Sequence, residues 1–218
     1  AVAAFLDARF VESHVEAVRR ALAQGRASLP VAEPPGPANT SHLSVIDGEG
    51  MAVALTTTAG ESAGYVVPGT GMIPNNILGE EDLNPRGFHR WPAGARIPTM
   101  MTPTIVLRDG TIRLVTGSGG SNRIRSAILQ TLSNVLDFDL PLEAAVGAPR
   151  VHLENRVLQC EAGYDPAAVA AVEAAGYPVN RWKARSIYFG GAHSVGATPA
   201  GLVAAGDDRR GGAAATVS

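Results

Sequence analysis

The sequence has one cysteine, few charged residues and no long apolar run. Because Cys160 is alone among 218 residues, no internal disulfide can form, and its strand-like surroundings (156–161) predict a buried, unreactive thiol. No stretch of about 18 apolar residues occurs, and Asp7 and Arg9 interrupt the apolar start, so neither a spanning helix nor a signal peptide is predicted. With 17% charged residues and a formal net charge of -2, nothing points to nucleic acid or a membrane surface as a partner. The localisation stays open.

Motifs for metals, phosphates and serine nucleophiles are also missing. Gly-x-Ser-x-Gly does not occur, and the glycine run near residue 119 lacks the Lys-Ser/Thr ending of a Walker loop. The histidines show no metal-ligand spacing and no cysteine cluster accompanies them, so we expect neither a metal nor a cofactor. These histidines are His14, His42, His89, His152 and His193.

The order of expected elements predicts an α+β fold of antiparallel sheets covered by helices. Apolar spacing predicts a helix over 3–24, and four prolines predict an exposed, extended connector over 27–38. Alternating β-branched residues predict a hairpin of 40–47 and 51–58. The remaining expectations are a loop region over 60–101, a hairpin of 104–107 and 111–116, helices over 122–136, 142–147 and 166–175, and strands near 150–161, 186–195 and 201–205.

Thr40 stands where the connector gives way to the first strand. If the chain is cut between Asn39 and Thr40, the threonine gains a free amine beside its own hydroxyl, so nucleophile and base lie in one residue. The hairpin places Thr58 at the same end of the paired strands. His42 shares a strand face with Thr40, but a structural histidine is the favoured interpretation. From the residues alone, Thr40 is a modest candidate, because threonines at strand starts are mostly structural.

The stretch from Gly117 to Gly120 precedes a predicted helix. Backbone N–H groups there can bind an anion or stabilise the oxyanion that develops during acyl transfer. A tight turn without a ligand is the alternative.

A series of motifs runs in order from Thr40 to the end of the chain, at residues 40–47, 52–58, 67–71, 75–76, 103–106, 116–120, 148–150, 189–191 and 207–211. Together they resemble the small subunit of the γ-glutamyltranspeptidases, which are N-terminal-nucleophile hydrolases. The resemblance implies an αββα sandwich, incomplete in this chain. It also implies that residues 1–39 are the tail of a large subunit and residues 40–218 the small-subunit catalytic domain.

The resemblance further implies roles for individual residues. The precursor would cleave itself between Asn39 and Thr40, and Thr40 would then form an acyl-enzyme with its own amine as base. Thr58 would hydrogen-bond the nucleophile, and Gly119 and Gly120 would supply the oxyanion hole; an ungapped alignment shifts this pair by one residue. The implied partners are a small γ-glutamyl or other acyl-amide substrate, and a large-subunit portion or another copy of the chain.

Five positions that align with the family's substrate-binding residues differ from its pattern. Gly60 replaces an asparagine, Ile77 a glutamine and Glu80 an aspartate, while Thr99 and Met100 stand at the serine pair that holds the α-carboxylate. Loss of donors that a zwitterionic substrate requires changes specificity strongly. We therefore expect a self-processing amide hydrolase or acyltransferase with altered acyl specificity. The alternative is a catalytically inactive structural or interaction remnant of the same fold.

Overall fold

The computed structural model describes residues 8–23, 40–60, 62–80, 83–84 and 86–217. The chain divides into two compact units, Ala1–Pro37 and Ala38–Ser218. The first contains the helix α2 (Ala8–Ala23), which confirms the predicted helix over those residues. The start of that prediction and the Pro-rich connector lie outside the described residues.

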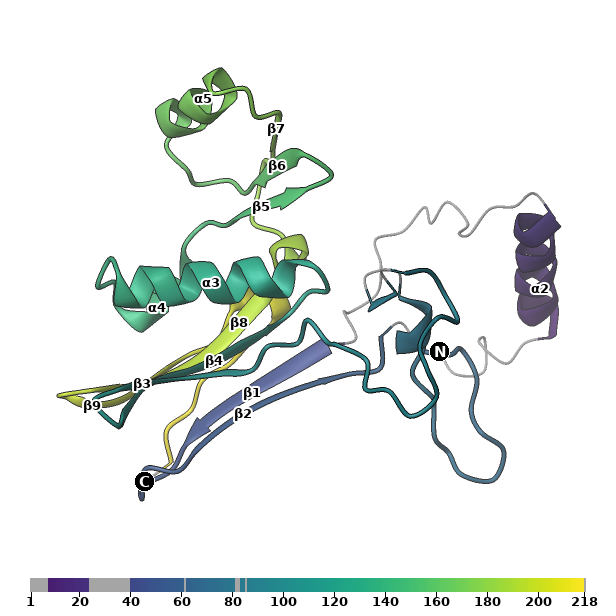
Figure 1. The fold of residues 1–218 in the computed structure, drawn as a ribbon, viewed down its shortest axis with the longest axis horizontal. Helices are drawn as coiled ribbons and strands as arrows, with labels where there is room; N and C mark the ends of the chain where they lie inside the picture. The colour runs from purple at the N-terminus through teal and green to yellow at the C-terminus, as the bar shows by residue number, and fades with distance from the viewer. Residues whose placement is uncertain (1–7, 24–39, 61, 81–82, 85, 218) are drawn as a thin grey trace. The chain divides into compact units, whose positions relative to one another are not determined.

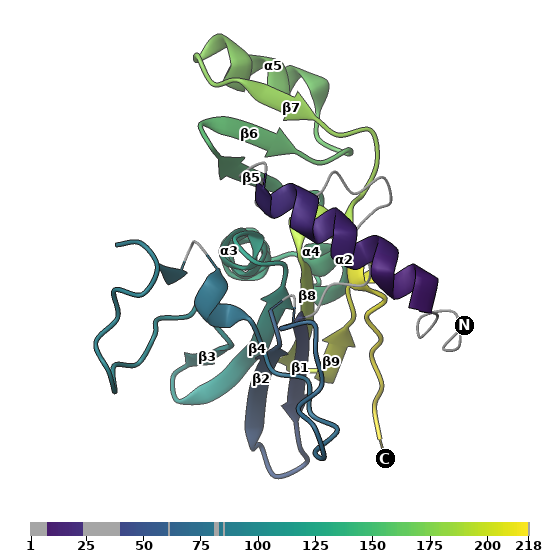
Figure 2. The ribbon, with the colours of Figure 1, turned by 90° about the vertical axis from the view of Figure 1, so that its right-hand side faces the viewer.

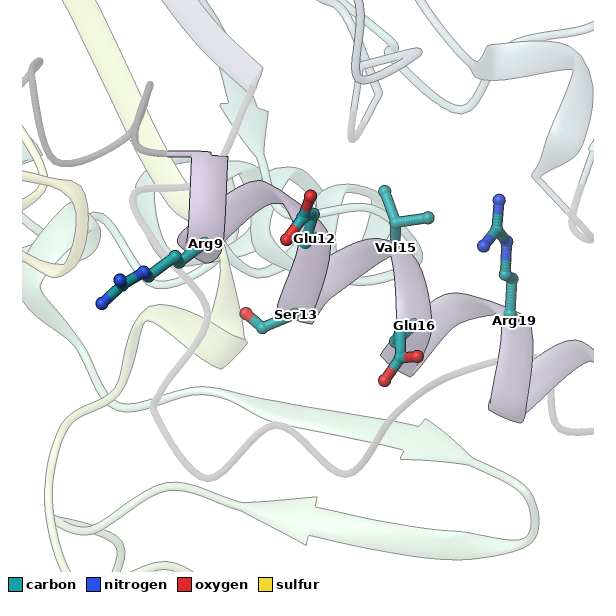
Figure 3. A pocket seen from close by; sticks show the side chains of 6 residues that line it. All are labelled: Arg9, Glu12, Ser13, Val15, Glu16 and Arg19. Carbon is teal, nitrogen blue, oxygen red and sulfur yellow. The ribbon is translucent and has the colours of Figure 1, made fainter.

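Side chains of α2 line a pocket (Figure 3). All of them come from this one helix, and none is a predicted site residue. They are Arg9, Glu12, Ser13, Val15, Glu16 and Arg19.

The second unit has a helical layer, a four-stranded sheet and a two-stranded hairpin stacked in that order (Figure 1). The four-stranded sheet has the order β3-β4-β8-β9 with all neighbours antiparallel, so the α+β class is confirmed. The layers comprise α3 (Arg123–Leu136) and α4 (Leu142–Gly147), then β3 (Thr104–Arg108), β4 (Thr111–Gly119), β8 (Gly191–Thr198) and β9 (Gly201–Ala205), then β1 (Thr40–Ile46) and β2 (Ala52–Thr58).

The two faces of β4 carry different kinds of side chain. Leu114 points to the helices and forms the core with Val135 of α3 and Val146 of α4. The three side chains are only 0%, 7% and 2% exposed, respectively. On the opposite face the strand has Gly117 and Gly119, over which β1 packs. Because these residues lack side chains, the hairpin and the sheet approach each other closely (Figure 2).

The outer face of the hairpin is apolar. Within the described part of this unit, no helix covers the side chains of Leu43, Val45, Val53 and Leu55, which are between 39% and 54% exposed. A sandwich of two stacked sheets with helices on one outer face is thus only part of an αββα fold.

A third sheet lies beyond α3, with the strands β5 (Val151–Glu154), β6 (Val157–Cys160) and β7 (Val179–Arg181), next to α5 (Pro166–Ala174). The Asp165 carboxylate caps α5 by accepting a hydrogen bond from the Ala167 N–H at 2.9 Å. Sequence periodicity did not predict β7, which has three residues and pairs in parallel with β6. Cys160 is buried as predicted, and burial raises the pKa of its thiol.

Candidate active site around Thr40

Thr40 and Thr58 face each other at one end of the β1–β2 hairpin. The strand register pairs the two residues directly, as predicted. The Thr40 hydroxyl donates a hydrogen bond to Thr58 Oγ1 at 2.9 Å, and the Gly60 N–H donates to the same oxygen at 3.0 Å. Thr58 therefore fixes the rotamer of the Thr40 hydroxyl, and the turn at Gly60 fixes Thr58 in place.

The glycine run reaches Thr40 from the neighbouring sheet. A Cβ on Gly119 would lie 2.6 Å from the Thr40 carbonyl oxygen, so only glycine fits where β4 passes the nucleophile candidate. Gly120 has a φ of +133° and lies against Gly190, whose Cα would be 2.8 Å from a Cβ at position 120. The structure thus brings Thr40, Thr58, Gly119 and Gly120 together.

The strand expected over 111–116 extends further, to Gly119. β4 stays paired with β8 as far as the Gly119–Gly191 pair, and only the next three residues turn into α3. The glycines at 117 and 119 are required by close packing of the hairpin rather than by a turn. The turn itself is closed by a hydrogen bond from the Arg123 N–H to the Gly120 carbonyl at 3.1 Å.

Arg210 is a residue of this region that the sequence did not single out. Its alkyl chain lies across Gly191, where a Cβ would be 2.6 Å from Arg210 Cδ. Its Nη1 and Nη2 are 3.2 Å and 3.5 Å from the Cβ positions of Gly119 and Gly120. Residues 207–211 had stood out only as a family-like motif, and no spacing rule links them to the glycines.

Two of the predicted substrate-side residues lie beside Thr58. A Cβ on Gly60 would be 2.2 Å from Asn76 Oδ1 and 2.9 Å from Glu80 Oε1, so both polar side chains converge on this glycine. Ile77 begins the short 3₁₀ helix Ile77–Gly79 between them.

Thr99 and Met100 are not brought into this group. The Thr99 hydroxyl accepts a local hydrogen bond from the Met101 N–H at 3.1 Å, and Met100 is half-buried. In the part of the chain that the structure describes, no hydrogen bond joins either residue to Thr40 or Thr58.

His42 is a structural histidine, as favoured from the sequence. Its ring lies over Gly117 and its two nitrogens contact Thr56 Oγ1 at 2.7 Å and Ser44 Oγ at 2.9 Å. Burial, together with the nearby His193, lowers the pKa of His42 to about 4. The neutral ring is therefore the form that stabilises the hairpin near neutral pH.

A buried ionic cluster holds the C-terminal segment against the domain. Arg209 pairs with Glu161 at 2.5 Å and with Asp207 at 3.2 Å, and Arg150 pairs with Asp207 at 2.7 Å. The four side chains are at most 2% exposed. Burial opposes the ionised form of Asp207, but the two arginines outweigh it and hold the pKa of Asp207 below its ordinary value. This cluster fixes the chain immediately before Arg210.

The described ranges offer neither a metal centre nor a membrane-spanning helix. No three His, Cys, Asp or Glu side chains there are grouped closely enough to hold a metal ion. None of the described helices has the length and apolar character needed to cross a bilayer.

Comparison with known proteins identifies the relatives of this architecture. The family model for gamma-glutamyltranspeptidase matches residues 1–217. The chain belongs to the gamma-glutamyltranspeptidase family. This confirms the family resemblance, and the proenzymes among its relatives agree with the processing that the resemblance implies.

Two curated relatives carry different activities in their names. The glutathione hydrolase proenzyme of Pseudomonas aeruginosa is 38% identical over 128 residues, covering 53% of this chain and 23% of the relative. The acylase ACY 1 proenzyme of Pseudomonas sp. strain SE83 is 37% identical over 146 residues, covering 66% of this chain and 26% of the relative. The chain thus spans about a quarter of the length of these two curated relatives.

A solved structure shows the same fold. The gamma-glutamyltranspeptidase of Pseudomonas nitroreducens, complexed with L-DON, aligns with a TM-score of 0.68 and 28% identity, covering 81% of this chain and 99% of the aligned chain. The expected N-terminal-nucleophile hydrolase fold is confirmed, and the chain covers part of it.

Proposed function

We propose that this chain is the small-subunit region of a self-processing amide hydrolase or acyltransferase in which Thr40 forms an acyl-enzyme. Residues 1–39 are then the tail of the large subunit and residues 40–218 the catalytic domain. The observation that carries the proposal is the 2.9 Å hydrogen bond between the Thr40 and Thr58 hydroxyls, with Gly119 packed against the Thr40 carbonyl. This arrangement supports a positioned hydroxyl as the nucleophile, with the N–H groups of the neighbouring glycines as the proposed oxyanion donors.

The proposed reaction begins with a cut between Asn39 and Thr40. The free Thr40 amine then accepts the proton of its own hydroxyl, directly or through a water, while Oγ1 attacks the amide carbonyl. The N–H groups of Gly119 and Gly120 stabilise the negative oxygen of the tetrahedral intermediate. When the intermediate collapses, the leaving amine takes the proton. Water or a second amine then attacks the acyl-enzyme and regenerates Thr40.

The substrate side supports an acyl donor that differs from a standard γ-glutamyl group. Gly60 and Ile77 provide no side-chain donor where the family pattern has asparagine and glutamine, and only Glu80 keeps a carboxylate for an ammonium group. Thr99 and Met100 replace the serine pair that would hold a carboxylate. One relative is named a glutathione hydrolase and another an acylase, so the names allow either a γ-glutamyl or a different acyl donor. We infer an acyl-amide substrate.

We expect a partner to cover the outer face of the hairpin. The exposed outer face of β1 and β2 carries four large apolar side chains, a composition typical of a surface that another layer buries. The large-subunit portion of the same precursor, or another copy of the chain, is the partner that we propose for this face.

Mass spectrometry of the intact chain tests the first step. We expect incubation to split the chain between Asn39 and Thr40, the Thr40→Ser variant to split as well, and Thr40→Ala to remain whole because no hydroxyl can attack the preceding peptide bond. A wild-type chain that stays uncut, indistinguishable from Thr40→Ala, would contradict self-processing.

Covalent labelling tests the second step. After the cut, an electrophilic glutamine analogue such as L-DON should modify Thr40, and Thr40→Ala should abolish hydrolysis of γ-glutamyl and other acyl anilides while circular dichroism stays unchanged. If the processed protein neither labels nor turns over any anilide, the inactive-remnant interpretation replaces the enzyme.

A further inference from the structure

Arg210 is a half-buried cation for which the described part of the chain offers no counter-ion. It forms no ion pair or side-chain hydrogen bond with any residue that the structure describes, and its Nε is buried without a partner. The neighbouring arginine differs completely, because Arg209 makes ion pairs with both Glu161 and Asp207. A desolvated guanidinium without a partner is costly, so we expect an anion other than the described side chains to neutralise it.

The position of the guanidinium is set from two sides. The Arg150–Asp207–Arg209 ion pairs anchor the residues just before it, and Gly191 leaves space for its alkyl chain. Substituting Gly191 with any larger residue would displace Arg210, since a Cβ there lies between 2.6 Å and 2.9 Å from the Arg210 side chain.

The guanidinium lies over the glycine pair next to Thr40. Nη1 is 3.2 Å from the Cβ position of Gly119, and the Thr40 carbonyl oxygen is 2.6 Å from the same point. Nη2 is 3.5 Å from the Cβ position of Gly120, whose N–H donates to no backbone acceptor among the described residues. The Arg210 guanidinium and the Gly119–Gly120 turn thus lie together beside the proposed nucleophile.

The other described charges around Arg210 do not neutralise it. Burial, followed by repulsion from Arg123, lowers the pKa of Arg210, and Asp207 opposes this shift. The Asp207 carboxylate is already bonded to Arg150 and Arg209. Arg123 is held against the Tyr188 ring at 4.7 Å and lies 3.9 Å from Glu154. The local field therefore remains positive at the glycine turn.

We propose that Arg210 and the Gly119–Gly120 turn form an oxyanion-binding site, in which Arg210 stabilises the negative carbonyl oxygen that develops when Thr40 attacks an amide. The assignment to the reaction rests on the proposed function, whereas the anion site itself does not. A hydrogen bond from a charged donor is stronger than one from a neutral donor. A cation already fixed near the developing oxyanion stabilises it without any rearrangement of the site during the reaction.

Binding of a carboxylate to the 218-residue chain tests the site without turnover. In a ¹H–¹⁵N NMR titration with sodium acetate at constant ionic strength, the amide signals of Gly119 and Gly120 should shift and saturate, while acetamide should leave them unchanged. Arg210→Met should raise the dissociation constant for acetate by about tenfold or more, and Arg210→Lys should restore most of the affinity. Arg108→Met, at an exposed hairpin end, serves as the control and should bind like the wild type.

Two results of this titration would contradict the proposed anion site. Absence of a saturable shift in the wild type, or equal affinity in Arg210→Met spectra that retain their dispersion, removes the anion site. If acetate binds as expected but Thr40 never labels, the anion site stands and the proposed function fails.

Kinetics of the processed enzyme test the assignment to the reaction. Because charge on the carbonyl oxygen develops only in the transition state, Arg210→Met should lower kcat by about 10²-fold with little change in KM, and Arg210→Lys should recover part of the loss. A raised KM with unchanged kcat would instead mean that Arg210 binds a carboxylate of the substrate, which overturns the proposed role in the reaction.

Discussion

Removing the charge of Asp207 should destabilise the protein far more than removing the charge of its neighbour in sequence. The Asp207 carboxylate forms ion pairs with Arg150 at 2.7 Å and Arg209 at 3.2 Å. It also accepts hydrogen bonds from the backbone N–H groups of Ala192 at 2.9 Å and Arg209 at 3.0 Å. Its side chain is 0% exposed. The Asp207→Asn variant leaves two buried arginines facing the single carboxylate of Glu161. Loss of one partner from a buried ion pair costs about 3–5 kcal/mol.

Asp208→Asn is the matched control. The Asp208 side chain is 68% exposed and its pair with Arg185, at 2.7 Å, lies at the surface. Screening by water limits such a pair to roughly 0–1 kcal/mol. Urea unfolding and calorimetry of the wild type and both variants should thus separate them, with the melting temperature of Asp207→Asn falling by roughly 10 °C. Equal and small losses in the two variants would refute the reasoning.

The pH dependence of this difference gives a further check. Because the folded-state pKa of Asp207 lies below its ordinary value, the stabilisation is fully present above the ordinary carboxyl pKa. It is lost as pH falls through the lowered folded-state pKa. The gap in unfolding free energy between wild type and Asp207→Asn should therefore stay constant near neutral pH and shrink only in strong acid.

Two further predictions concern the interface between hairpin and sheet. Gly117→Ala should destabilise the protein by about 1–3 kcal/mol in urea unfolding, because the new Cβ would lie 2.2 Å from a buried His42 ring held by two hydrogen bonds. As the control, Gly48→Ala has open space around the new Cβ and should stay within about 1 kcal/mol of wild type. Since the pKa of His42 falls from 6.5 to about 4, the unfolded chain binds the proton more readily, so the urea midpoint should fall as pH drops from 6.5 towards 4. A midpoint with the same pH slope in His42→Gln would contradict this second prediction.

Local sequence patterns predicted the hairpins and most helices because these elements depend on contacts between nearby residues. Alternation in 40–47 and 51–58 gave the strands of β1 and β2, and the register that pairs Thr40 with Thr58 follows from the short connection between them. The three-residue strand β7 had no usable period, and its pairing with β6 depends on a distant segment. The C-terminal part of β4 was missed for the same reason, since its pairing partner lies more than seventy residues further along the chain.

The candidate site was only partly accessible from the sequence. Motif order selected Thr40, Thr58 and the glycine pair, and the structure brings these residues together. The same comparison selected Thr99 and Met100, which form local contacts in a separate loop. Aligned position alone does not determine whether a loop side chain reaches a site.

The sequence by itself determined the family, the class of fold and the hydroxyl that we propose as the nucleophile, because these depend on residue type and on order along the chain. Only the tertiary structure showed why Gly117 and Gly119 must be glycine, since the atoms that exclude a side chain belong to another strand. It alone placed Arg210 over the glycine turn, about ninety residues away in sequence, with no ion-pair partner among the described residues. Charge pairing and close packing are properties of folded neighbours, so no local pattern encodes them.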